Sequence, residues 1–205
     1  MTSNPSASHN GVGASVADLA IGQQLRERRR AAGLSLNALA ARTGCSIGYI
    51  SQVERGLSTA SIKFLTAAAD AFGIGLSGFF VSEAQAQAQA KPGDDIVVRR
   101  GERGRLGLWR SGIAKELLTP PQGASALNLF MVRIEPFGSS GEEDYRHGGE
   151  EAGFVIEGEL TLKVDGREFH LEAGDSFRFE SRRPHRFANP TDRPAVVLWV
   201  NAATA

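Results

Sequence analysis

Residues 36–55 read LNALAARTGCSIGYISQVER, and this stretch decides the fold of the first half of the chain. A helix-turn-helix needs a small residue where its two helices cross, a glycine-like residue in the turn and apolar anchors on the second helix. In chain order these positions are filled by Ala40, Gly44, Ile50 and Val53. The spacing predicts two short helices joined by a tight turn. A helical hairpin in some other kind of bundle is the alternative that this spacing leaves open.

Capping residues predict where the helices begin. Ser35 and Ser46 are suitable N-caps for helices over 36–43 and 47–55. Apolar spacing predicts three further helices, at 18–32, 61–72 and 76–80. Together they make a compact all-helical domain of five helices over residues 18–81.

The charge balance differs between the two halves, although the chain as a whole is neutral. Residues 18–81 carry seven basic and four acidic side chains, whereas residues 94–205 carry fifteen basic and eighteen acidic ones. A basic half suits a polyanion, but an excess this small has meaning only beside the motif.

Other features exclude several classes of protein. The single Cys45 excludes an intramolecular disulfide framework and fits a reducing cytosol. No apolar run approaches the roughly 18 residues needed to cross a bilayer. We therefore expect a cytoplasmic protein with no membrane partner. Residues 1–17 lack a signal-peptide core and predict a disordered tail, and the low-complexity segment 82–95 predicts a linker.

The motif resembles the phage-repressor-like (Xre-type) helix-turn-helix family, most clearly in its closing ISQVERG. The resemblance implies that the second helix enters the major groove of double-stranded DNA. Positions expected to face the bases are Ile47, Gly48, Ser51 and Gln52, and positions expected at phosphates are Ser46, Tyr49, Arg42 and Arg55. Gly48 is unusual there because it removes a side chain from a base-reading position. The resemblance also implies a partly buried ion pair between Arg29 and Glu54.

From residue 96 onward the pattern changes to short alternating segments separated by Gly, Pro and Asp. The expected strands are LNLFMVRIE, GFVIEG, ELTLKV, REFHL, DSFRF and AVVLWV. Asp165-Gly166 between two alternating runs predicts a two-residue hairpin. Many short strands without intervening helices predict a sandwich or a small barrel.

This half resembles the cupin family over about residues 96–201. The first cupin motif is matched by Gly138, Tyr145-Arg146-His147, Glu151 and Gly158, and the second by Gly174, His185 and Asn189. The resemblance implies a double-stranded β-helix (jelly-roll) barrel over 96–205, and so a two-domain α + β protein. It departs from the family at Tyr145, where the first histidine ligand is expected.

The remaining ligand set is His147, Glu151 and His185. Two histidines and one carboxylate suit non-haem Fe(II), although zinc, manganese or nickel can be held in the same way. Tyr145 either adds a weak phenolic ligand or closes the pocket. Phe154 and Trp199 are expected inside the barrel, with Phe154 beside Tyr145 at the ligand pocket. The alternative is a barrel that binds an organic ligand, or nothing, with these residues as a hydrogen-bond cluster.

The acidic stretch 142–144 precedes the pocket and has two readings. It is either a solvated loop or a feature that attracts a cationic ligand such as a polyamine.

These features predict a sequence-specific transcriptional regulator, a repressor, whose cupin barrel senses a small-molecule effector or a metal. The barrel is also expected to supply a homodimer, because an isolated helix-turn-helix makes too few contacts for tight binding. The alternative is a non-haem iron epoxidase with the same two domains and a helical half that no longer regulates. A storage-type cupin is disfavoured by the DNA-reading half.

Overall fold

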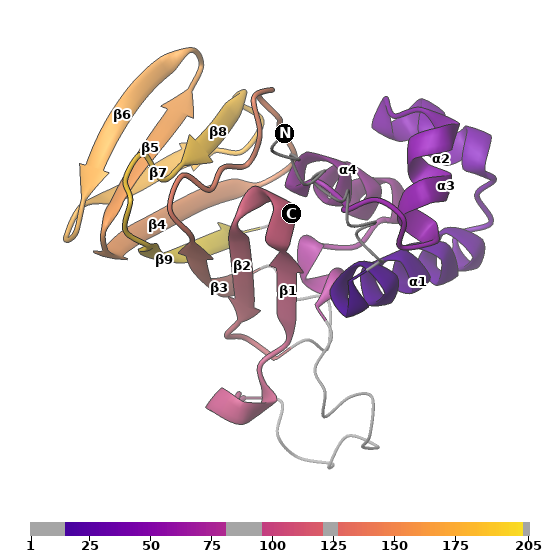
Figure 1. Cartoon of the computed structure of the whole chain (residues 1–205), viewed down its shortest axis with the longest axis horizontal. Helices are drawn as coiled ribbons and strands as arrows, with labels where there is room; N and C mark the ends of the chain where they lie inside the picture. Colours follow the sequence, from indigo (N-terminus) through magenta and orange to yellow (C-terminus); the bar gives the residue numbers. More distant parts are fainter. Residues whose placement is uncertain (1–14, 81–95, 121–126, 203–205) are drawn as a thin grey trace, which may run out of the picture.

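The computed structural model describes residues 15–80, 96–120 and 127–202. Most of the tail expected over 1–17 and all of the linker expected over 82–95 lie outside these ranges. Figure 1 shows a helical body packed beside a β-barrel, with α4 on the side of the helical body that faces the barrel.

Serine caps define the four α-helices of the described N-terminal half. In each case the side-chain oxygen of the cap accepts a hydrogen bond from a backbone N–H in the first turn. The caps are Ser15, Ser35, Ser46 and Ser61. The helices are α1 (Val16–Ala31), α2 (Leu36–Thr43), α3 (Ile47–Glu54) and α4 (Ile62–Phe72). Capping therefore fixes the two helices of the motif almost where the sequence places them.

Two helices differ from expectation by more than one residue. The fifth helix is a single 3-10 turn, η1 (Leu76–Phe79), because Gly75 and Gly78 disfavour a longer helix in so short a segment. α1 begins at Val16, two residues earlier than expected, because the hydroxyl of Ser15 caps it.

The described strands form two sheets. The six-stranded sheet has the order β1-β2-β3-β9-β4-β7, and the three-stranded sheet has the order β6-β5-β8. The strands are β1 (Arg105–Leu108), β2 (Ile113–Leu117), β3 (Leu127–Ile134), β4 (Glu150–Glu157), β5 (Glu159–Val164), β6 (Arg167–Glu172), β7 (Ser176–Glu180), β8 (His185–Ala188) and β9 (Ala195–Ala202). Two short 3-10 turns, η2 (Arg100–Glu102) and η3 (Trp109–Ser111), flank β1.

The hairpin between β5 and β6 has the geometry that its sequence predicts. Asp165 and Gly166 both have positive φ, at 51° and 76°, as a type I′ turn requires, and Val164 pairs with Arg167. The strands β1, β2 and β8 were not expected from the sequence. They are four or five residues long. Gly107 interrupts the apolar pattern of β1, and Lys115 and Glu116 interrupt that of β2.

The helical half and the barrel share one hydrophobic core. Phe80, which follows η1, lies against Phe130 of β3 with ring centroids 5.1 Å apart, and both side chains are buried. In the described part of the chain, no helix is long and apolar enough to span a membrane.

α1 and α3 cross closely and are joined by an ion pair. The Nε of Arg29 on α1 lies 2.6 Å from the Oε1 of Glu54 on α3, and a second guanidinium nitrogen donates to Oε2 at 2.9 Å. Both side chains are largely buried, at 11% and 6% exposure, so this is the partly buried pair expected from the sequence. At the crossing, a Cβ on Gly22 would lie 2.3 Å from the carbonyl oxygen of Val53.

Two helical glycines give opposite predictions for the same substitution. Gly22→Ala would push α1 away from α3, and we expect a loss of about 1–3 kcal/mol in the free energy of unfolding. At Gly48 a Cβ would meet nothing closer than the Ser46 Oγ at 4.0 Å. Gly48→Ala should therefore stabilise α3 by up to about 1 kcal/mol. Urea unfolding of both variants checks this, and equal effects at the two sites would contradict the close crossing.

Candidate metal centre and DNA-reading surface

The barrel interior collects three side chains with metal-binding atoms. Glu151 belongs to the inward-facing set of β4, His185 opens β8, and His147 lies in the loop just before β4. One ligand atom from each of these residues lies within 4.8 Å of the other two. The structure thus brings together the whole set that the sequence proposed as metal ligands.

The hydrogen bonds of the two histidines direct the Nε2 atom of each ring toward the cluster. His185 Nδ1 donates to the carbonyl oxygen of Arg183 at 2.8 Å, and His147 Nδ1 donates to that of Gly148 at 2.9 Å. The Nε2 of His185 is buried and has no hydrogen-bond partner among the described residues. A buried nitrogen without a partner is costly unless something fills the space before it, and a divalent cation would fit there.

The charges of the same cluster also suit a bound cation. Burial raises the pKa of Glu151, but the hydrogen bond and charge of His147 outweigh it, so the pKa is lowered and the carboxylate stays ionised. Burial lowers the pKa of His185, which keeps that ring neutral. His147 lies with Nε2 2.7 Å from Glu151 Oε1; burial lowers its pKa, but Glu151 more than offsets this and the pKa is raised. A bound cation would take the place of the proton on His147.

Two residues on β9 hold the carboxylate in place. Trp199 Nε1 donates to Glu151 Oε2 at 3.1 Å, and Asn201 Nδ2 lies 3.4 Å from Oε1. Trp199 is buried, as expected. The hydrogen bond from its indole N–H to Glu151 was not expected from its hydrophobicity. Such outer contacts orient ligands and raise metal affinity.

Tyr145 lies against the cluster as a neutral phenol. Its ring lies edge-on to that of His185, with centroids 4.3 Å apart. Burial, together with the negative charge of Glu151, raises the pKa of Tyr145 well above its ordinary value, so the phenol stays protonated. Of the two roles expected for this residue, the arrangement favours closing the pocket.

A buried lysine, missed in the sequence, completes the interior. Lys115 points inward from β2, and its Nζ lies 5.7–5.9 Å from the ring centroids of Phe130, Phe187 and Trp199. Burial lowers its pKa to about 8, against the attraction of Glu151. The sequence could have indicated this burial, because Lys115 lies midway between the apolar residues Ile113 and Leu117. Alternate residues of a strand face the same side.

Phe154 does not line the pocket, and the expectation for it was wrong. Its side chain is 44% exposed and points out of the barrel. Successive side chains of a strand alternate between faces, so a residue three places after the inward-facing Glu151 must face outward.

α3 carries the residues that the sequence predicts to face DNA, and most of them are exposed. Ile47, Gly48 and Gln52 are exposed on it, and Ser51 is half-buried. Ser46 caps α3, and its hydroxyl accepts a hydrogen bond from Tyr49 N. The described contacts of the two arginines expected at phosphates are to carbonyl oxygens, from Arg42 to Ala71 and from Arg55 to Ser51.

Tyr49 has a structural task. Its hydroxyl accepts a hydrogen bond from Ser61 N at 3.1 Å and lies 3.4 Å from Thr59 O. Its ring packs edge-on against Phe64, with centroids 5.2 Å apart. Tyr49 thus ties the loop after α3 to the start of α4, which leaves its hydroxyl less free for a phosphate.

A helix-turn-helix pair joined to a cupin barrel defines a class of DNA-binding transcriptional regulators. Residues 20–77 match the helix-turn-helix domain family, and residues 130–201 match the cupin domain family. The HTH-type transcriptional regulator PuuR of Escherichia coli (strain K12) is 31% identical over 172 residues, covering 83% of this chain and 88% of that protein. The chain therefore belongs to the family of helix-turn-helix transcriptional regulators with a cupin domain.

A solved structure agrees on the fold. An HTH_3 family transcriptional regulator from Vibrio cholerae superposes with a TM-score of 0.68 and 26% identity, covering 92% of this chain and 97% of that one. A hydroxypropylphosphonic acid epoxidase from S. wedmorenis matches with a TM-score of 0.42 and 20% identity, covering 90% of this chain and 97% of that one. A likeness that weak carries no argument about activity.

The cluster predicts one divalent cation per chain. We expect Zn²⁺ or Ni²⁺ to bind with 1:1 stoichiometry in calorimetry, and Glu151→Gln to weaken binding at least about tenfold. Trp199→Phe, which removes only the N–H that orients Glu151, should weaken it about 10–100-fold. His170→Gln is the control, since that histidine is 73% exposed and outside the cluster. Equal affinities in all four proteins would show that the cluster is only a hydrogen-bond network.

Proposed function

We propose that this chain is a repressor that binds its operator as a homodimer and responds to a small molecule or metal in its barrel. The observation that carries the proposal is a continuous set of contacts between the barrel site and the helix that faces DNA. Such contacts allow an effector that prefers one arrangement of the domains to change DNA affinity.

Base reading falls to the exposed start of α3. Gln52 can bond adenine bidentately, and Ile47, 45% exposed, suits a thymine methyl group. Gly48 offers no side chain, so it allows the backbone to come close to the groove. Ser46 and Arg42 lie at the edges of this surface, where the phosphates of a bound duplex would pass.

The outer face of the six-stranded sheet suits the dimer contact. Six of its outward positions in the middle of β3, β9 and β4 are apolar and lie side by side in register: Leu129, Met131, Leu198, Val200, Ala152 and Phe154. Phe154 and nearby Ile156 are 44% and 45% exposed. An apolar face of this kind marks an interaction site, and a two-fold pair of recognition helices requires a second copy of the chain.

The route from barrel to DNA runs through α4. Lys63 of α4 pairs with Glu143, which lies in the loop leading to His147, and the charges of Asp70 on α4 and His147 also interact. α4 packs against α2, which packs against α3 (Figure 1). Occupation of the metal centre thus acts on a loop that touches the helical domain.

The DNA-binding prediction concerns Gln52. Gln52→Ala should weaken binding to the operator about 10–100-fold, because a bidentate base contact contributes about 1–3 kcal/mol of discrimination. Binding to unrelated DNA at low salt should not change. Footprinting on the region upstream of the chain's own gene, with fluorescence anisotropy for affinity, measures both. Failure of the unmodified protein to bind any genomic fragment at low salt would remove the proposal.

The dimer prediction concerns Phe154. Phe154→Asp places a charge in the apolar face and should raise the dimer dissociation constant about 30-fold or more, as measured by sedimentation velocity. Thr161→Asp adds the same charge to the other sheet and should leave the dimer intact. A monomeric unmodified protein, or a dimer equally weakened by both changes, would place the contact elsewhere.

A further inference from the structure

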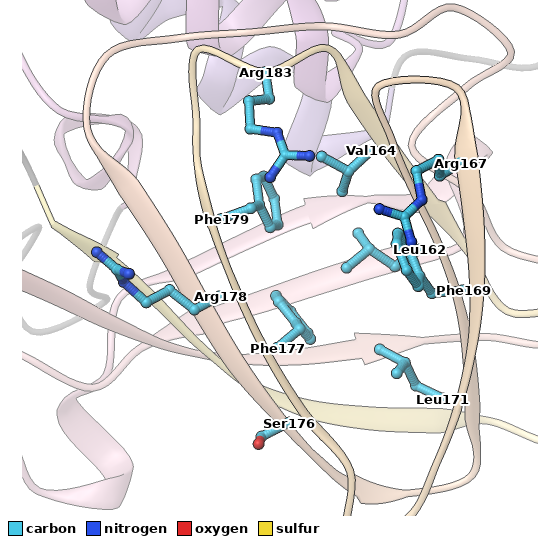
Figure 2. Close-up of a pocket in the computed structure, with 10 residues that line it drawn as sticks. All are labelled: Leu162, Val164, Arg167, Phe169, Leu171, Ser176, Phe177, Arg178, Phe179 and Arg183. Atoms are coloured by element: carbon cyan, nitrogen blue, oxygen red, sulfur yellow. The ribbon is translucent and has the colours of Figure 1, made fainter.

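A cavity of about 280 Å³ opens where the barrel is not closed by hydrogen bonds. β6 and β7 are the edge strands of their sheets, and the cavity lies between them. Figure 2 shows its lining: side chains from β5, β6, β7 and the loop before β8. The volume is just below the range of about 300–1,000 Å³ for ordinary ligand pockets, so its ligand must be small.

The body of the cavity is apolar. Its lining includes Leu162, Val164, Phe169, Leu171, Phe177 and Phe179. Phe177 also lies edge-on to Trp199, with centroids 4.9 Å apart, and Phe179 lies 4.9 Å from the ring of His185. The cavity wall is therefore in contact with the metal centre.

Three arginines also line the cavity, and two of them point into it. In Figure 2 the side chains of Arg167 and Arg183 reach toward the same end of the cavity, whereas Arg178 extends away from it. Arg178 pairs with Glu150, and Arg183 pairs with Asp165 at 2.6 Å. Arg167 stacks over Phe169 and has no ion-pair partner among the described residues. This end of the cavity therefore carries about one uncompensated positive charge.

Negative charge is missing from the cavity. None of the described residues that line it is acidic. The acidic stretch before the metal centre is occupied elsewhere, since Glu143 pairs with Lys63 and Asp144 lies 3.6 Å from Arg186. A cationic ligand would thus meet like charges without a carboxylate to bind it.

We propose that the effector of this barrel is a small monocarboxylate with an apolar body. The guanidinium groups of Arg167 and Arg183 hold the carboxylate, and the apolar side chains cover the rest of the molecule. A monoanion matches the single uncompensated charge, and the planar guanidinium fork matches a carboxylate. The inference rests on the proposed function, because it names the class of effector for the same barrel.

The site also has a direct connection to the metal ligands. The backbone carbonyl of Arg183 accepts the hydrogen bond from His185 Nδ1 at 2.8 Å. A carboxylate that draws in the Arg183 side chain thus acts on the residue that orients His185.

A matched series of ligands tests the class. Hexanoate, hexan-1-ol and hexylamine share one apolar body and differ in head-group charge, and 1,4-diaminobutane represents a polyamine. Calorimetry is run on the full chain near neutral pH with EDTA, so that no metal can hold the carboxylate. We expect hexanoate to bind at least about tenfold more tightly than hexan-1-ol, and the two amines not to bind.

Variants locate the head group. Arg167→Gln and Arg183→Gln should each weaken hexanoate binding about tenfold and leave hexan-1-ol unchanged. Arg178→Gln is the matched control, because that side chain loses the same charge but points away from the cavity. Thermal unfolding of each variant verifies that it is folded.

Three outcomes would overturn the inference. They are tighter binding of an amine than of hexanoate, no effect of either Arg167→Gln or Arg183→Gln, and no hexanoate binding at millimolar concentration. If hexanoate does not bind and Arg167→Gln changes the sedimentation coefficient, the edge strands β6 and β7 instead pair with a second copy of the chain. DNA binding is measured separately: operator binding without hexanoate binding refutes only this inference, and hexanoate binding without DNA binding refutes only the repressor.

Discussion

The buried carboxylate of Glu151 is the constraint on which the barrel interior depends. An ionised carboxylate inside a protein is costly unless it is paired and hydrogen-bonded. Here His147 and the β9 residues Trp199 and Asn201 contact its oxygens, and His185 Nε2 lies 3.8 Å away. One side chain thereby ties β4, β9, β8 and the loop before β4 to one another. Its charge raises the pKa of His147, whereas burial outweighs its attraction at His185 and Lys115 and lowers the pKa of both.

Side-chain packing connects the interior of the barrel to the helical half. The ammonium group of Lys115 lies over Phe130, whose other neighbour is Phe80 at the end of the helical domain. Glu143 and Lys63 make a second contact between the two halves, in the loop that leads to His147. Two contacts of different kinds, one apolar and one ionic, thus join the domains. An exposed ion pair contributes little to stability. The aromatic contact therefore holds the two domains together, and the ion pair can break and form again.

Much of the fold followed from local signals in the sequence, and the parts that did not have physical reasons. The caps Ser35 and Ser46 act within one turn, so α2 and α3 were predicted almost to the residue. Phe154 was misplaced because its hydrophobicity was given more weight than the alternation of β4, which already put Glu151 inside. Lys115 was missed because a charged residue in a short strand is normally exposed, and its burial depends on aromatic rings from three other strands. His147, Glu151 and His185 were found because they lie in the two cupin motifs. Their outer partners on β9 lie in neither motif, so no motif in the sequence marked them.

The crossing of α1 and α3 has a consequence for how a signal can be transmitted. The backbone of Val53 lies where a side chain on Gly22 would be, and Arg29 holds Glu54 with two hydrogen bonds. The hydrogen bond from Ser61 N to the Tyr49 hydroxyl also holds α3 to the start of α4. These contacts hold α3 against both α1 and the start of α4. In the proposed function, an effector therefore changes the spacing between the two recognition helices of the dimer and leaves the shape of each helix unchanged.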